Sequence, residues 1–233
     1  MNISPDNIVM LQFGKISFNA TIIYTWITMA VIVIFSWIAT RRLTTEVNIS
    51  RWQNLLEVLV TGMKNQIRSI SRQEPDRFLP LIGTLFIFIA VSIVFGIIPG
   101  YQPPTGSLST TAALALCVFI AVPLFGIKEH GIIGYLKQYL QPSPFMLPFN
   151  ILGEISRTIA LAVRLFGNVM SGSVIIAILV SIAPLIFPIL MQALGLLTGL
   201  IQAYIFAILS TVYIASATSA HVKKEQMSEK SKK

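Results

Sequence analysis

Five long apolar runs constrain the fold of this chain more than any other feature. Each has at least the roughly 20 residues that an α-helix needs to cross a bilayer; they cover 16–40, 78–98, 108–127, 150–182 and 185–217. Only 11% of the residues are charged, against about 25% in a typical soluble domain. Lipid must therefore be the main solvent. The sequence predicts an all-α polytopic membrane protein, with five transmembrane helices in a single membrane domain.

A sixth helix is predicted between the first two spans, over 50–72, with Ser50 as its N-cap. Basic side chains line one face of it, and apolar side chains recur at helical spacing on another: Leu55, Leu56, Leu59, Val60, Met63 and Ile67. This pattern indicates an amphipathic helix on the membrane surface. The alternative is a helix that packs on a soluble partner.

The basic residues predict how the chain is oriented. With five spans, three basic segments fall on one side: 41–77, the loop after 127, and the tail 218–233. The other side carries only Lys15. By the positive-inside rule, the N-terminus (1–15) is outside and the tail is cytoplasmic. The last two runs exceed the length of a perpendicular crossing, so we expect a tilted hairpin that turns at Ala183-Pro184.

Composition excludes several other classes of site. The net charge of +8 is explained by membrane orientation, so nucleic acid is not an expected partner. Cys117 is the only cysteine, and His130 and His221 lie far apart. No disulfide within the chain, metal centre or cofactor is therefore expected. The first run lacks a basic segment before it and a clear cleavage site, so it is expected to be retained.

Three charges lie within the fourth run: Glu154, Arg157 and Arg164. The first two are near its cytoplasmic start, where long side chains can reach the interface. Arg164 is two turns further in, where an arginine costs at least about 2.5 to 3.5 kcal/mol. No acidic residue lies within a turn or two on its inward side, which predicts a partner on another subunit.

A polar stripe surrounds Arg164 on the helical wheel. It occupies about a third of the circumference and contains Glu154, Arg157, Arg164, Asn168, Ser171 and Gly172. A Glu154–Arg157 ion pair that ties two helices together is the alternative for those two residues. The last run carries a second polar set, Thr198, Gln202 and Tyr213, with Gln192 at its start. Hydrogen bonding between helices is one interpretation of this set; a glutamine facing Arg164 is the other.

These signatures resemble a known family. Arg164-Leu165-Phe166-Gly167-Asn168, together with Gln202-Ala203-Tyr204-Ile205-Phe206 in the last run, is similar to the a subunit of F-type ATP synthases. The resemblance implies a non-catalytic, ion-translocating Fo subunit of an energy-coupling membrane, such as the bacterial inner membrane. It also implies three partners: a ring of c subunits, b-type stalk subunits and the remaining synthase subunits.

The resemblance assigns roles to the polar residues. Arg164 would displace the ion from the c-subunit carboxylate and separate two aqueous half-channels. Asn168, Gln202, Arg157 and Glu154 would position it or line the ion path, with Ser171, Thr198 and Tyr213 supplying further oxygens. Some a subunits carry a glutamate and a histidine where this chain has Ser173 and Gly195. This lining suits Na⁺ at least as well as H⁺, and the N-terminal segments Ser4-Pro5-Asp6-Asn7 and 50–54 resemble the sodium-linked N-type branch.

Two other classes of protein remain open from the sequence alone. A secondary transporter or channel could use Arg164 to bind an anionic substrate, and would work without a carboxylate-bearing ring. A purely structural membrane anchor would have no need of Arg164.

Overall fold

A computed structural model describes residues 9–13, 16–41, 51–98, 100–139, 145, 147–182 and 187–218. The longest elements are helices, as predicted: α1 (Ala20–Thr40), α2 (Arg51–Ser71), α3 (Leu79–Phe95), α4 (Leu108–Tyr139), α5 (Leu147–Ile182) and α6 (Phe187–Thr218). Two short 3-10 helices, η2 (Pro75–Arg77) and η3 (Pro104–Gly106), lie in the connections. Ser50, the turn at Ala183-Pro184 and the tail beyond Thr218 lie outside the described residues.

The first predicted span begins too early. Residues before α1 form a two-stranded antiparallel hairpin of β1 (Val9–Phe13) and β2 (Ile16–Asn19). The segment Ile16–Asn19 alternates apolar and polar residues, and this period of two suits a strand better than a helix. The prediction of an all-α chain is therefore wrong for this hairpin, and α1 starts at Ala20.

The second and third predicted spans also end elsewhere. Helix α3 has 17 residues and is shorter than the predicted 78–98, because tight turns at Gly96 and Ile97 follow it. Helix α4 continues past the predicted end at 127 and breaks at Gly131, whose φ of 69° is left-handed. By length and composition, four helices of the described chain can cross a membrane, and α3 is a shorter apolar helix.

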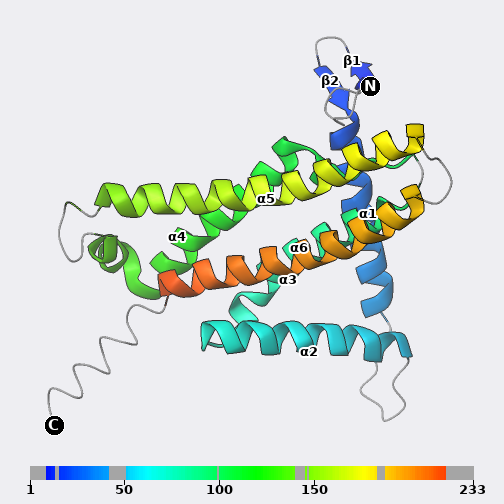
Figure 1. Ribbon diagram of the computed structural model, residues 1–233. Helices are drawn as coiled ribbons and strands as arrows, with labels where there is room; N and C mark the ends of the chain where they lie inside the picture. Colours follow the sequence, from blue (N-terminus) through cyan, green and yellow to red (C-terminus); the bar gives the residue numbers. More distant parts are fainter. Residues whose placement is uncertain are drawn as a thin grey trace, which may run out of the picture.

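Helices α5 and α6 form a long antiparallel pair (Figure 1). Helix α5 has 36 residues and α6 has 32, so at 1.5 Å per residue they are about 54 and 48 Å long. Figure 1 shows both running at a steep angle to α1, with α2 crossing the opposite end of α1. This agrees with the predicted hairpin of long helices.

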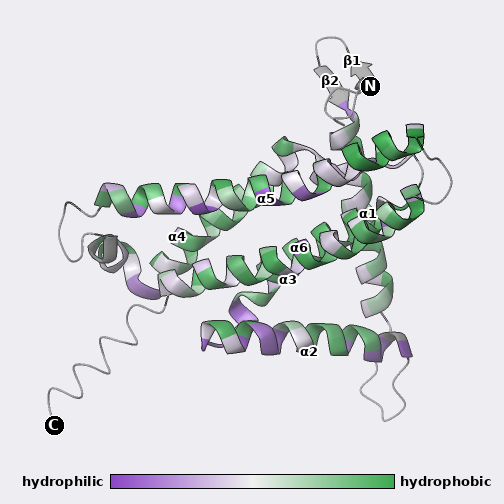
Figure 2. Ribbon diagram, in the orientation of Figure 1, coloured by the Kyte–Doolittle hydropathy of each residue, from purple (hydrophilic) through white to green (hydrophobic). Residues whose placement is uncertain are grey.

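The core lies where α3 and α4 pack against α5 and α6. Leu165, Phe206 and Ile89 are fully buried there. Gly199 permits this packing, because a Cβ added to it would come within 2.7 Å of the Ile93 side chain. Figure 2 shows that α1, α5 and α6 are largely apolar along their length. Many of their large apolar side chains are nevertheless exposed, as expected of helices that meet lipid.

A polar cluster ties α1 to the connection between α3 and α4. The Tyr101 hydroxyl lies 2.6 Å from the hydroxyl of Thr28, which is fully buried. The Tyr24 hydroxyl donates a hydrogen bond to the Gly100 carbonyl at 3.0 Å. Burial raises the pKa of Tyr101, so its phenol stays neutral. This cluster fixes the start of the segment that leads into η3.

Candidate functional site

Arg164 lies on the exposed side of α5, between two buried neighbours, Leu161 and Leu165. These two leucines anchor the helix to the core, so the arginine is directed away from the bundle. Within the described part of the chain its side chain makes no ion pair or hydrogen bond. A carboxylate partner for Arg164 on another subunit stays a prediction.

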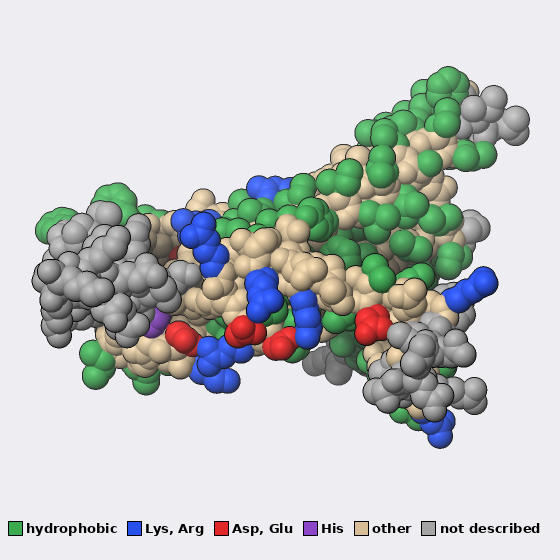
Figure 3. All heavy atoms as spheres, turned by 90° about the horizontal axis from the view of Figure 1, so that it is seen from below, with side chains coloured by type: hydrophobic (Ala, Val, Ile, Leu, Met, Phe, Trp, Pro, Cys, Tyr) green, Lys and Arg blue, Asp and Glu red, His purple; other side chains and the backbone are tan. Residues whose placement is uncertain are grey.

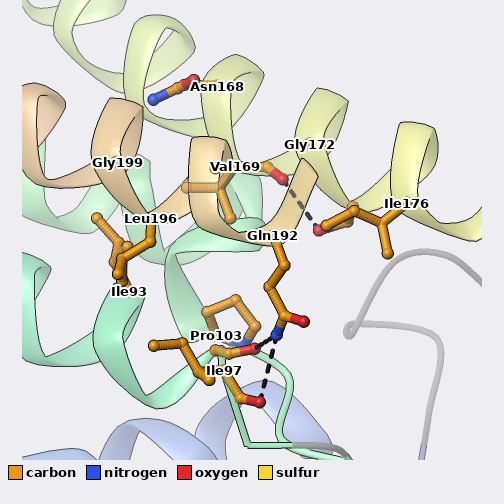
Figure 4. Close-up of a pocket in the computed structure, with 13 residues that line it drawn as sticks. Ile93, Ile97, Pro103, Asn168, Val169, Gly172, Ile176, Gln192, Leu196 and Gly199 are labelled. Atoms are coloured by element: carbon orange, nitrogen blue, oxygen red, sulfur yellow. Dashed lines mark hydrogen bonds between the residues drawn. The ribbon is translucent and has the colours of Figure 1, made fainter. Parts of the chain in front are cut away.

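A hollow follows Arg164 along α5 (Figure 4) and contains about 510 Å³ of space, part of it open to the outside. It begins at Asn168, about 6 Å further along the helix. Its wall is formed by the end of α3, Pro103, α5 and α6, and none of the lining residues is titratable. They are Ile93, Gly96, Ile97, Pro103, Asn168, Val169, Gly172, Ser173, Ile176, Gln192, Gly195, Leu196 and Gly199. We call it the C-side hollow. Both Ser173 and Gly195, singled out by the sequence, line it.

A smaller hollow precedes Arg164 and contains about 310 Å³ of space, part of it open to the outside. It ends at Thr158, about 9 Å before the arginine along α5. Helices α4, α5 and α6 line it: Val118, Phe119, Val122, Glu154, Arg157, Thr158, Tyr213 and Ser216. We call it the N-side hollow. The Arg157 guanidinium lies over the Tyr213 ring, 5.6 Å from its centroid, a cation–π distance.

Two of the predicted polar residues, Asn168 on α5 and Thr198 on α6, connect these helices. The Asn168 amide nitrogen donates to the Thr198 carbonyl at 3.2 Å. Ser171 is exposed and donates to the Asn168 carbonyl within α5. The first interaction is a hydrogen bond between helices, one turn beyond Arg164.

Gln202 is only 6% exposed, and its amide nitrogen has no hydrogen-bond partner among the described residues. Buried polar groups are nearly always paired, so this donor is suited to water or to a polar group of another subunit. The structure gives no hydrogen bond between Gln202 and Arg164. Their direct pairing stays a prediction.

Neither hollow could be predicted from the sequence. Each combines residues more than 30 positions apart, and no local pattern reports such contacts. The importance of Gln192 was missed for the same reason. Its amide nitrogen reaches the carbonyls of Gly96 and Ile97, both at 3.2 Å (Figure 4).

These features define a polytopic membrane protein with an arginine between two hollows, unpaired among the residues that the structure describes. The sequence matches the ATP synthase A chain family over residues 22–215, and the chain belongs to this family. It is 62% identical over 218 residues to "ATP synthase subunit a 2" of Acaryochloris marina, covering 94% of this chain and 93% of that one. It is 57% identical to "ATP synthase subunit a" of Albidiferax ferrireducens, covering 99% of this chain and 100% of that one.

Membership of this family makes the chain an ion-translocating subunit of the membrane sector, not the catalytic unit. It is an integral membrane protein that works with the other subunits of ATP synthase. The family does not favour the transporter that remained open from the sequence alone.

Proposed function

We propose that this chain is the stationary subunit against which a ring of c subunits turns, and that Arg164 displaces the ion from each passing carboxylate. The observation that carries the proposal is the order of features along α5. The N-side hollow, Arg164 and the C-side hollow follow one another, and the arginine is exposed and unpaired among the described residues. Two separate aqueous routes with a fixed charge between them need this order.

The electrostatics suit such a displacement. An ion pair at 4 Å is worth roughly 4 kcal/mol at an effective dielectric constant of 20. This attraction lowers the pKa of the approaching carboxylate and makes it release its ion. The same attraction is weak enough for a driven ring to move on. Because Arg164 is always charged, it also repels cations that could leak between the hollows.

The finer topology belongs to the same proposal. Counting α3 with the four longer helices gives five spans in one membrane domain, and the basic segments then lie on the cytoplasmic side. With this orientation the N-side hollow opens to the cytoplasm and the C-side hollow to the outside. A bacterial inner membrane is the expected location, and the α5–α6 pair is long enough to lie strongly tilted in it. Stalk subunits of the b type are expected partners.

Disulfide crosslinking tests whether a c ring faces Arg164. Ser171 is exposed and within about 20° of Arg164 around α5. In a Cys117→Ser background, Ser171→Cys should crosslink to a cysteine placed beside the carboxylate of c. Val33→Cys on α1 is the matched control, because Val33 is 65% exposed on a helix that does not contact α5 extensively. Crosslinking of Val33→Cys alone would contradict the proposal.

We also propose Na⁺ as the coupling ion. The C-side hollow offers oxygen atoms and no titratable side chain, and Na⁺ needs oxygen ligands but no proton acceptor. ATP hydrolysis by the purified complex should rise with added Na⁺ at alkaline pH, and Na⁺ should protect the c carboxylate from carbodiimide. Activity that ignores Na⁺ from mildly acidic to alkaline pH would establish proton coupling instead and leave the role of Arg164 intact.

A further inference from the structure

Gln192 connects α6 to the end of α3. Its side-chain nitrogen donates to the carbonyls of Gly96 and Ile97, both at 3.2 Å. These residues directly follow Phe95, the last residue of α3. Carbonyl groups at the C-terminal end of a helix lack partners within that helix. The Gln192 amide, from a distant part of the chain, donates a hydrogen bond to each of two such carbonyls, so both of its N–H groups are used.

The orientation of this amide decides what it presents to the C-side hollow. Figure 4 shows its nitrogen directed at the two carbonyls and its oxygen turned away from them. A carboxamide oxygen can only accept hydrogen bonds or coordinate a cation. Gln192 therefore offers the hollow an acceptor in a fixed position.

The other polar groups of the hollow are arranged in the same way. The Asn168 nitrogen is bonded to the Thr198 carbonyl at 3.2 Å, which leaves its oxygen as an acceptor. The Ser173 hydroxyl donates to the Val169 carbonyl at 2.9 Å. Backbone carbonyls thus take both N–H groups of Gln192, the hydroxyl hydrogen of Ser173 and one of the two N–H groups of Asn168. A wall that presents mainly acceptors and no charged group suits water or a hydrated cation better than an anion.

The hollow has free space next to Gln192. Gly195 lies one turn further along α6, and a Cβ added to it would meet nothing within 4 Å. At Gly199, by contrast, an added Cβ would collide with Ile93. Helices α3 and α6 are therefore in close contact at Gly199 and separate toward Gln192, where the side-chain amide spans the gap.

We propose that Gln192 is a positioning residue of the outer ion route, an inference that rests on the proposed function. Its amide holds the end of α3 against α6 and fixes a carbonyl oxygen in the wall that an entering hydrated cation contacts. The residue acts on entry of the ion and has no part in the displacement at Arg164.

The test separates ion entry from the maximal rate. Gln192→Met keeps the length of the side chain and removes the amide. In liposomes containing the whole complex, ATP synthesis is measured against outer Na⁺ concentration and, separately, outer pH. For the coupling ion, the half-saturating concentration should rise about two- to ten-fold, as expected for the loss of one or two hydrogen bonds. The maximal rate and the half-saturating concentration on the cytoplasmic side should stay unchanged.

Leu190→Met is the matched control. Leu190 is 60% exposed on the same helix, about 160° from Gln192 around it, and the change should leave both parameters at the parent values. A purely structural Gln192 would lower assembly or the maximal rate without shifting half-saturation, which would overturn the inference. Gln192→Leu is the second variant, and failure of both complexes to assemble would assign Gln192 to folding of the α3 end and also overturn it.

Failure of this inference can be distinguished from failure of the proposed function. If Arg164→Ala abolishes coupling while Gln192→Met behaves like the parent, only the inference about Gln192 fails. If Arg164→Ala still couples, the proposed function fails whatever Gln192 does.

Discussion

Helices α2 and α5 both carry basic side chains along one face, but their charges have different partners. On α2, Lys64 pairs with Asp76 at 2.7 Å and Arg68 with Glu74 at 3.5 Å. Figure 3 shows basic and acidic side chains close together on this face of the molecule. On α5, Arg157 lies over the Tyr213 ring and Arg164 has no partner among the described residues.

The difference follows from the solvent of each helix. The charged side chains on α2 are mostly exposed. Water screens them, so their ion pairs contribute little to the free energy of folding. An arginine within a spanning helix costs several kcal/mol unless it is paired or hydrated. Because this free-energy cost is high, an arginine within a spanning helix indicates a functional residue. The comparison therefore supports the proposed role of α5, although α2 carries more charges.

The largest expected effect comes from removing the unpaired charge. Arg164→Ala should abolish ion-driven ATP synthesis, because α5 carries no other charged residue between Thr158, where the N-side hollow ends, and Asn168, where the C-side hollow begins. The soluble catalytic sector should still hydrolyse ATP. Synthesis in inverted vesicles and hydrolysis after release of that sector measure the two activities.

Arg164→Gln is the control for shape, since it keeps a polar side chain without the charge. It should be nearly as inactive as Arg164→Ala. Coupled synthesis near the parent rate in either variant would show that the fixed charge is dispensable and would remove the distinction between α5 and α2.

An intermediate effect is expected at the N-side hollow. Arg157→Ala removes the cation–π contact with Tyr213, which is worth about 0.5 to 1 kcal/mol at a partly exposed site. Synthesis should fall about two- to five-fold, with coupling retained. Arg157→Lys, which keeps the charge over the ring, should recover most of the loss. Complete inactivity of Arg157→Ala in a fully assembled complex would contradict this expectation and would show that Arg157 is as necessary for coupling as Arg164.

The smallest effect is expected on α2. The Arg68–Glu74 pair has side chains 67% and 75% exposed, and exposed pairs contribute about 0 to 1 kcal/mol. Arg68→Ala should leave coupled synthesis at the parent rate and lower the thermal denaturation temperature only slightly. Glu74→Ala serves as the reciprocal change. A loss of synthesis in Arg68→Ala but not in Glu74→Ala would indicate that Arg68 binds another subunit.

The structure shows where part of the apolar face of α2 is covered, and the choice between a membrane surface and a soluble partner stays a prediction. Its second half packs on the bundle through Ile67, which is 3% exposed, whereas Leu55 and Val58 in its first half are 56% and 66% exposed. The periodicity predicted an apolar face but could not show where that face is covered. A membrane surface beneath the first half is the expected partner.

The sequence alone determined the class of protein, the long helices and the unusual charge. Runs of apolar residues set helix length through the thickness of the bilayer, and an arginine in such a run is conspicuous because its cost is high. The signatures around Arg164 and Gln202 indicated the family that the comparisons then showed. These are local properties, which a single sequence displays directly.

Only the tertiary structure decided what surrounds Arg164. Helix ends depended on contacts with other segments. The segment Ile16–Asn19 became a strand because it pairs with β1. Helix α4 continued past residue 127, and the ring nitrogen of His130 in this extension lies 3.1 Å from the Thr218 carbonyl. The two hollows and the Gln192 bridge arise because α3, α4, α5 and α6 converge. Such contacts depend on how helices pack side by side, and the spacing of residues along one helix carries no record of them.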